Sequence, residues 1–309
     1  MVKRGLLACG LWAWASVAIT AQELEPRAYA AAPVGLNFLV VAAGRSTGGV
    51  LVDPSLPIED VQASVDSLAL GIGKTLNVFG RTGLAVVAVP FAWVSASGLV
   101  ADTPGHVSRT GLADPRLKLS VNLVGGRALS PREFARASRS TIVGVSLTML
   151  PPVGQYNRTR LVNIGSNRWS FKPEVGVSHA IARWTIEGYA GVWLFTTNDQ
   201  FYRGVSIRTQ DPIVALQTHV SYTLRPRLWF SGDATWYSGG TTTVDGVLKA
   251  DLQRNSRIGA TMSLALSRQQ SFKISGSTGA TTRVGSDFRT LAVAWQLAWF
   301  DRPRNESPQ

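Results

Sequence analysis

The sequence predicts an all-β fold: a closed, antiparallel transmembrane β-barrel of about twelve strands, formed by residues 34–300. The first observation is that large apolar residues alternate with small or charged ones over about ten residues, and this pattern recurs about a dozen times without a long helical segment between. Such alternation is typical of strands whose two faces meet different media, and about ten residues let a tilted strand cross a hydrocarbon layer. The second observation is that long and short connections alternate, as in even-stranded outer-membrane barrels.

The first element along the chain is a signal peptide over residues 1–21. Two basic residues precede an apolar stretch from Leu6 to Ile19, and small residues surround Ala21. These are the three parts of a secretory signal, so we expect export followed by cleavage. Cys9 is the only cysteine, which leaves the mature chain without a disulfide or a thiolate metal site. Residues 22–33 are expected to form an N-terminal periplasmic segment.

The composition agrees with a membrane barrel and argues against a nucleic acid partner. Charged residues make up 16% of the chain and hydrophobic residues 45%, with 30 glycines. This balance suits strands in lipid joined by glycine-rich turns better than a disordered chain. The formal net charge is +12, but the basic residues are spread over turns and loops. A nucleic-acid-binding protein would gather them on one face.

Twelve strands follow the signal peptide. We expect them at 34–44, 59–74, 82–95, 113–124, 140–150, 169–179, 184–196, 213–224, 228–238, 256–267, 272–281 and 288–300. Five connections are long, and we expect their centres near Thr47, Pro104, Asn157, Tyr202 and Asp245. The connections after the sixth, eighth and tenth strands are tight. Long outer loops, short periplasmic turns and two periplasmic termini are therefore predicted.

One inner connection differs from the others, because it contains Ser130-Pro131-Arg132-Glu133. A serine N-cap, a proline in the first helical position and a glutamate three residues after the cap are typical of a helix start. The sequence predicts a short periplasmic helix near residues 131–137. Residues 301–309 are expected to form a C-terminal periplasmic tail.

The register follows from the basic residues within the strands. A lysine or arginine on the lipid face at mid-depth costs about 2–4 kcal/mol, so Lys118, Lys172 and Lys273 are expected to point inward. This places a set of polar and aromatic side chains in the lumen. The lumen-lining candidates are Lys118, Asn122, Lys172, Glu174, Glu187, Tyr189, Trp193, His219, Trp229, Asp233, Tyr237 and Arg257.

These candidates favour a solute of a particular chemistry. Aromatic rings with charges of both signs suit a small organic acid or a phenol, because the rings stack and a cation pairs with a carboxylate. The same charges could instead pair with one another and brace the wall, and the sequence leaves both interpretations open. If Pro226 is at the centre of a tight turn, His219 and Asp233 lie opposite each other on adjacent strands.

Several segments carry a resemblance to a known family. They are Glu25-Pro26-Arg27-Ala28-Tyr29 with Pro33-Val34-Gly35, then GLADPRLKL at 111–119, NIGSNRWSFKPEVGVS at 163–178 and TVDGVLKADLQRNSRIGAT at 243–261. Together they resemble the outer-membrane transporter family labelled putative meta-pathway of phenol degradation, over essentially the whole mature chain. The resemblance implies a small outer-membrane barrel that passes aromatic compounds or their breakdown products, and it brings no catalytic residues.

We therefore expect an outer-membrane channel or transporter for small organic solutes, and not an enzyme. Its expected partners are outer-membrane lipid and lipopolysaccharide, the assembly machinery, and a solute such as an aromatic acid or phenol. No cofactor or metal is expected, since the three histidines have no ligand spacing. One alternative is a structural or adhesive barrel. Another is a phospholipase using His219 and Ser221, although the predicted register turns both inward, away from lipid. Solute identity and oligomeric state stay open.

Overall fold

The computed structural model describes residues 24–51, 58–100, 103–138, 140–160, 162–201 and 206–301, so the expected signal peptide and most of the expected tail lie outside it. The strands are β1 (Leu36–Leu51), β2 (Ile58–Val78), β3 (Arg81–Val100), β4 (Thr103–Leu112), β5 (Arg116–Val124), β6 (Ile142–Leu150), β7 (Ser170–Ile181), β8 (Trp184–Phe195), β9 (Arg208–Gln210), β10 (Ile213–Arg225), β11 (Leu228–Gly239), β12 (Thr242–Val244), β13 (Val247–Leu248), β14 (Gln253–Ala265), β15 (Gln270–Thr281) and β16 (Gly285–Phe300). One helix, α1 (Pro131–Phe134), lies between β5 and β6.

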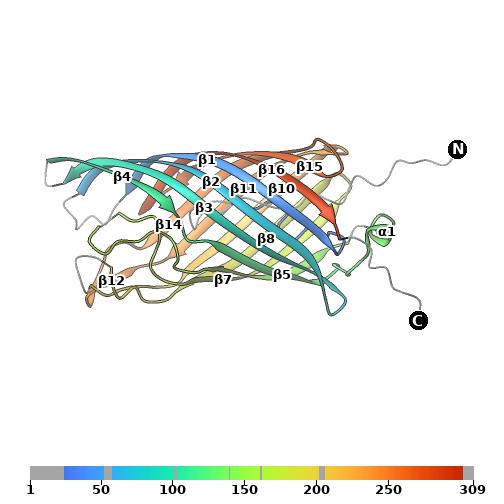
Figure 1. Ribbon diagram of the computed structural model, residues 1–309, viewed down its shortest axis with the longest axis horizontal. Coiled ribbons are helices and arrows are strands. Elements are labelled where there is room, and N and C mark those ends of the chain that lie inside the picture. The colour runs from blue at the N-terminus through green and yellow to red at the C-terminus, as the bar shows by residue number, and fades with distance from the viewer. Residues whose placement is uncertain are drawn as a thin grey trace.

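The strands form the predicted closed antiparallel barrel (Figure 1). The ring closes because β1 pairs with both β2 and β16, and β2 also pairs with β3. The main sheet has 13 strands, but β4 and β5 pair with successive parts of β3 and share one place in the ring, which gives twelve positions. β9, β12 and β13 form a separate small sheet in the long connections.

Two predicted loop centres are wrong. Thr47 lies in β1 opposite Arg289, and Pro104 lies in β4 opposite Leu99. The first strands are longer than expected, with 16, 21 and 20 residues in β1, β2 and β3. Most side chains of β4 are exposed on both faces. A strand with water on both sides needs no apolar alternation, so the period of two disappears there while the backbone ladder continues.

The wall has its apolar side chains on the outside and its polar side chains on the inside, which is the reverse of a soluble protein. In β10, Val214 and Leu216 are 41% and 43% exposed on the outside, whereas Gln217 and Ser221 are 3% and 0% exposed on the inside. The same exposure of apolar residues recurs around the ring. Apolar side chains left exposed over a whole barrel suit lipid, and polar side chains inside suit a lumen. Lys118 and Lys172 are buried inside, which confirms the predicted register.

The short connections match their predictions. Ala182 and Arg183 join β7 to β8, and a turn containing Pro226 joins β10 to β11. At α1, the Ser130 hydroxyl accepts a bond from the Glu133 N–H at 3.4 Å, and the Glu133 carboxylate accepts one from the Ser130 N–H at 2.8 Å. The helix ends at Phe134, and the residues to Ala137 continue as tighter i→i+3 turns.

In the described chain, no helix has the length and apolarity to cross a membrane.

Candidate functional site

The lumen holds residues 24–34, which we call the N-terminal segment. The expectation of a periplasmic segment at 22–33 is corrected for residues 24–33, because Ala28 and Tyr29 are buried and bond to wall residues of β6, β7 and β8. Val34 N–H bonds to the Leu129 carbonyl near α1, so the segment runs from that end of the barrel towards its middle. It enters because its carboxylate and phenol complement charged and polar groups that the wall buries.

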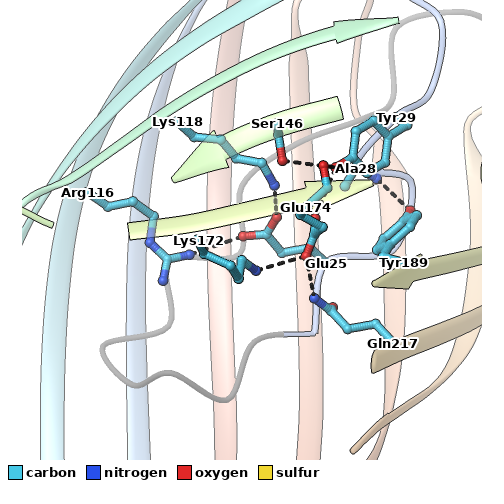
Figure 2. Close-up of polar contacts among 10 residues, drawn as sticks. All are labelled: Glu25, Ala28, Tyr29, Arg116, Lys118, Ser146, Lys172, Glu174, Tyr189 and Gln217. Carbon is cyan, nitrogen blue, oxygen red and sulfur yellow. Dashed lines mark hydrogen bonds and ion pairs between the residues drawn. The ribbon is translucent and has the colours of Figure 1, made fainter. Parts of the chain in front are cut away.

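Glu25 binds a cluster of basic side chains (Figure 2). Its carboxylate is 3.1 Å from Arg116 Nη1 and also pairs with Lys118 Nζ. Lys172 Nζ lies 3.0 Å from the carboxylate of Glu174 on the same strand, β7. Burial disfavours the ionised form of Glu25, but the positive charges of Lys118 and Lys172 prevail and hold the pKa of its carboxyl below the usual value.

Tyr29 fills a niche in the wall, which we call the Tyr29 pocket and define by Gly144, Ser146, Glu174, Gly176 and Tyr189. A Cβ atom at Gly144 or Gly176 would lie 2.4 or 2.2 Å from the Tyr29 ring, so both positions require glycine while the ring is present. These two glycines face each other across β6 and β7. The ring of Tyr189 meets that of Tyr29 edge to face, with centroids 5.0 Å apart.

The hydroxyl of Tyr29 is bound by polar groups on two strands. It lies 2.9 Å from Ser146 Oγ and donates to Glu174 Oε1 at 3.1 Å (Figure 2). The other carboxylate oxygen of Glu174 accepts a bond from Gln217 Nε2 at 3.2 Å. Burial raises the pKa of the Tyr29 phenol, so its hydroxyl keeps its proton and acts as the donor.

Arg27 fastens the N-terminal segment to β8, β10 and β11. Its backbone N–H donates to Glu187 Oε2 at 2.6 Å, and its guanidinium donates to Thr223 Oγ1 at 3.0 Å. The guanidinium also lies over the ring of Trp229, 4.3 Å from the centroid. The segment is therefore held mainly through side chains, and its described residues form no β-ladder with the wall.

The predicted pair His219 and Asp233 is present. The two residues are opposite each other on β10 and β11, and His219 Nδ1 lies 2.8 Å from Asp233 Oδ1. Asp233 also accepts bonds from Ser231 Oγ at 2.5 Å and Thr261 Oγ1 at 2.9 Å. This network braces three adjacent strands, β10, β11 and β14.

The structure places all twelve lumen candidates inside, each at most 5% exposed. They do not form one group. Lys118, Asn122, Glu174, Glu187, Tyr189 and Trp229 contact the N-terminal segment. Trp193 and Tyr237 pack together further along the lumen, with Lys172 Nζ 5.4 Å from the Trp193 ring centroid. Arg257 instead bonds to Ser277 on β15 and to the Phe288 carbonyl on β16.

The sequence-based set lacks the residues that the N-terminal segment contributes. Glu25 and Tyr29 precede the first strand and belong to no alternating pattern, so periodicity cannot assign them to the lumen. Arg116 is also absent from that set, although its position two residues before Lys118 places it on the same inward face. Among the described residues, no three histidine, cysteine or acidic side chains are grouped to hold a metal ion.

A closed barrel with an apolar outer face and a polar, charged lumen defines the class of outer-membrane β-barrel proteins. Residues 44–297 match the model of the family described as Putative MetA-pathway of phenol degradation, and the chain belongs to this family. No curated protein matches the chain significantly.

Solved structures share this fold. An outer membrane channel from Pseudomonas putida F1 is similar with a TM-score of 0.77 and 19% identity, over 90% of this chain and 100% of that one. The β domain of the Bordetella autotransporter Brka is similar with a TM-score of 0.52 and 12% identity, over 86% of this chain and 100% of that one. At such identities the likeness extends to the fold alone.

Proposed function

We propose that the protein is an outer-membrane channel for small organic solutes and that aromatic acids and phenols are its preferred class. The observation that carries the proposal is a set of buried wall atoms without a hydrogen-bond partner among the described residues. They are Thr148 Oγ1, Trp193 Nε1, Gln217 Oε1, His219 Nε2, Ser221 Oγ and Trp229 Nε1. An unpaired buried polar group costs about 1–3 kcal/mol, so these atoms favour a lumen that holds water or a polar solute.

The arrangement of rings and cations supports an aromatic solute. Lys172 lies over Trp193, and Lys273 Nζ is 5.9 Å from the ring centroid of Trp229. A flat solute with a carboxylate would stack on a ring and pair with the adjacent cation. The family description, which names phenol degradation, points to the same class of compound.

The N-terminal segment has to move before a solute passes. It lies across the lumen and is tied to β5 through Glu25 and to β8 through Arg27. A barrel of about this size is narrow, so one chain segment is enough to close it. Because side-chain contacts hold the segment, it is able to leave without disrupting the wall.

Planar-bilayer conductance tests the proposal, using the mature chain (residues 22–309) and a shortened chain that begins at residue 34. We expect discrete channels, more often open in the shortened chain, and block by benzoate but much less by cyclohexanecarboxylate, which has the charge without the aromatic ring. Trp193→Leu should weaken the benzoate block, and Trp184→Leu, on the outer face, should not. Silent membranes with both chains would instead favour the structural or adhesive role.

The phospholipase alternative has less support. It requires His219 and Ser221 to act on lipid, but both side chains are 0% exposed inside the barrel. His219 Nδ1 is bound to Asp233, and none of the described hydrogen bonds joins Ser221 to His219. A serine nucleophile needs such a contact with its base. We expect no fatty acid release when the purified protein is incubated with phospholipid.

A further inference from the structure

We propose that the Tyr29 pocket is a binding site for neutral phenols and that the Tyr29 side chain occupies it as a built-in ligand. The inference deepens the proposed channel function, on which its physiological meaning rests. It makes the N-terminal segment a competitor of the solute, so that a phenol entering the lumen takes the place of Tyr29 and loosens the segment.

The shape of the pocket matches a flat ring. Gly144 and Gly176 form its floor, where any side chain would collide with the ring, and the edge of Tyr189 lies at one side. The two glycines come from different strands and face each other directly, so the space belongs to the wall and remains when the segment leaves. The side chain of tyrosine is itself 4-methylphenol, which makes that compound the natural probe.

The polar end of the pocket selects a hydroxyl. Glu174 accepts a hydrogen bond from the Tyr29 hydroxyl, and Ser146 lies within hydrogen-bond distance of the same oxygen. Lys172 and Gln217 hold the carboxylate of Glu174 from its other oxygen. A ring without a hydroxyl would leave the acceptor unpaired, and a phenolate would bring a second negative charge against it. Sites built in this way reject analogues that lack the donor.

The covalent link of Tyr29 to the barrel explains why its side chain fills the pocket. A side chain held near its site by a short flexible linker acts at an effective concentration of about millimolar. A free phenol therefore has to compete at comparable concentration. Its apparent affinity equals its intrinsic affinity multiplied by the fraction of time for which Tyr29 leaves the pocket vacant.

Calorimetric titration of purified mature protein with 4-methylphenol at about pH 7, where phenols are neutral, tests the proposal. We expect Tyr29→Ala to bind at least about tenfold more tightly than the wild type. Tyr29→Phe, whose ring still fills the pocket, should show no such gain. The matched control is Tyr222→Ala, which removes a tyrosine that contacts Trp184 on the outer face. Toluene should bind Tyr29→Ala far more weakly than 4-methylphenol.

A second measurement keeps the wild-type pocket. The mature chain is expected to lack cysteine, so Ala30→Cys allows a spin label on the N-terminal segment. We expect millimolar 4-methylphenol, but not toluene, to increase the mobility of the label.

Equal binding of toluene and 4-methylphenol to Tyr29→Ala, or no binding by a correctly folded variant, would overturn the proposal. Either result is separable from failure of the channel function, because conductance and benzoate block are measured without reference to Tyr29. Conversely, tight binding of 4-methylphenol in a barrel that never conducts would uphold the pocket and remove the channel.

Discussion

Glu25 links the N-terminal segment to the wall by charge. It is the one acidic group that the segment's described residues bring to a region with Arg116, Lys118, Lys172 and Lys273. Removing one partner of a buried ion pair leaves the other charge buried and uncompensated, which is strongly destabilising. Glu25 is therefore the main charged tie of the segment, beside the contacts of Arg27 and Tyr29.

Glu25→Gln should release the N-terminal segment. Loss of one partner of a buried pair costs about 3–5 kcal/mol, enough to shift a two-state equilibrium by more than a hundredfold. We expect a higher open probability in planar bilayers and greater mobility of a spin label at position 30. Glu133→Gln, in α1 and away from the lumen, should leave both quantities at their wild-type values.

Acidification should have the same effect as Glu25→Gln. The pKa of Glu25 in the folded barrel is lowered from the reference value of 4.5, so its stabilising contribution is present above that pH and is lost as the pH falls through the lowered value. We expect label mobility to rise only below about pH 4.5. The facing groups are Arg116, Lys118, Lys172, Lys273 and the second carboxylate, Glu174. A transition that persists in Glu25→Gln would assign the effect to Glu174.

At the scale of elements, β6 and β7 form the Tyr29 pocket by pairing two glycines. Gly176→Ala should place its methyl group 2.2 Å from the Tyr29 ring and expel the segment. The clash with Tyr29 disappears when Tyr29 is also changed to alanine, and only the Tyr189 ring, whose Cδ1 lies 2.8 Å from the new methyl group, still has to shift. The two substitutions should therefore be strongly non-additive. Label mobility in the two single variants and the double variant would measure this coupling. Simple additivity would mean that Tyr29 does not occupy the pocket in solution.

Asp301, directly after β16, ties the end of that strand to β1 and β2. Asp301 accepts bonds from Asn37 Nδ2 at 2.8 Å and Lys74 Nζ at 3.0 Å, which join β16 to β1 and β2. The bonds from Asn37 and Lys74 lower the pKa of Asp301, so this tie is present at neutral pH. Deletion of 301–309 and deletion of 302–309 should both permit assembly. Only the first should lower the thermal midpoint, as seen by the heat-induced mobility shift on gels.

At the scale of the whole molecule, the wall and the N-terminal segment are separate in their stability. The wall closes through the ladders of β1 with β16 and β2 with β3, and neither ladder contains a residue of the segment. A chain that begins at residue 34 should therefore assemble as a barrel with the same heat-induced mobility shift and a larger conductance. An unassembled product would show that the segment is part of the folding core.

The features that depend on neighbouring residues could be predicted from the amino-acid pattern. Alternation along each strand placed Lys118 and Lys172 inside, and one tight turn was enough to pair His219 with Asp233, because hairpin register is set locally. The capping-box residues likewise marked the start of α1. These features need only periodicity, turn chemistry and the cost of charge in lipid.

The filling of the lumen depends on contacts between residues far apart in the chain. The bond of Glu25 to Lys118 spans 93 residues, and that of Arg27 to Glu187 spans 160. The N-terminal segment has no alternating pattern of its own, and it takes its place because a closed wall brings cations, carboxylates and two glycines together at one depth. Such complementarity exists only after the ring closes, so no local pattern in the chain encodes it.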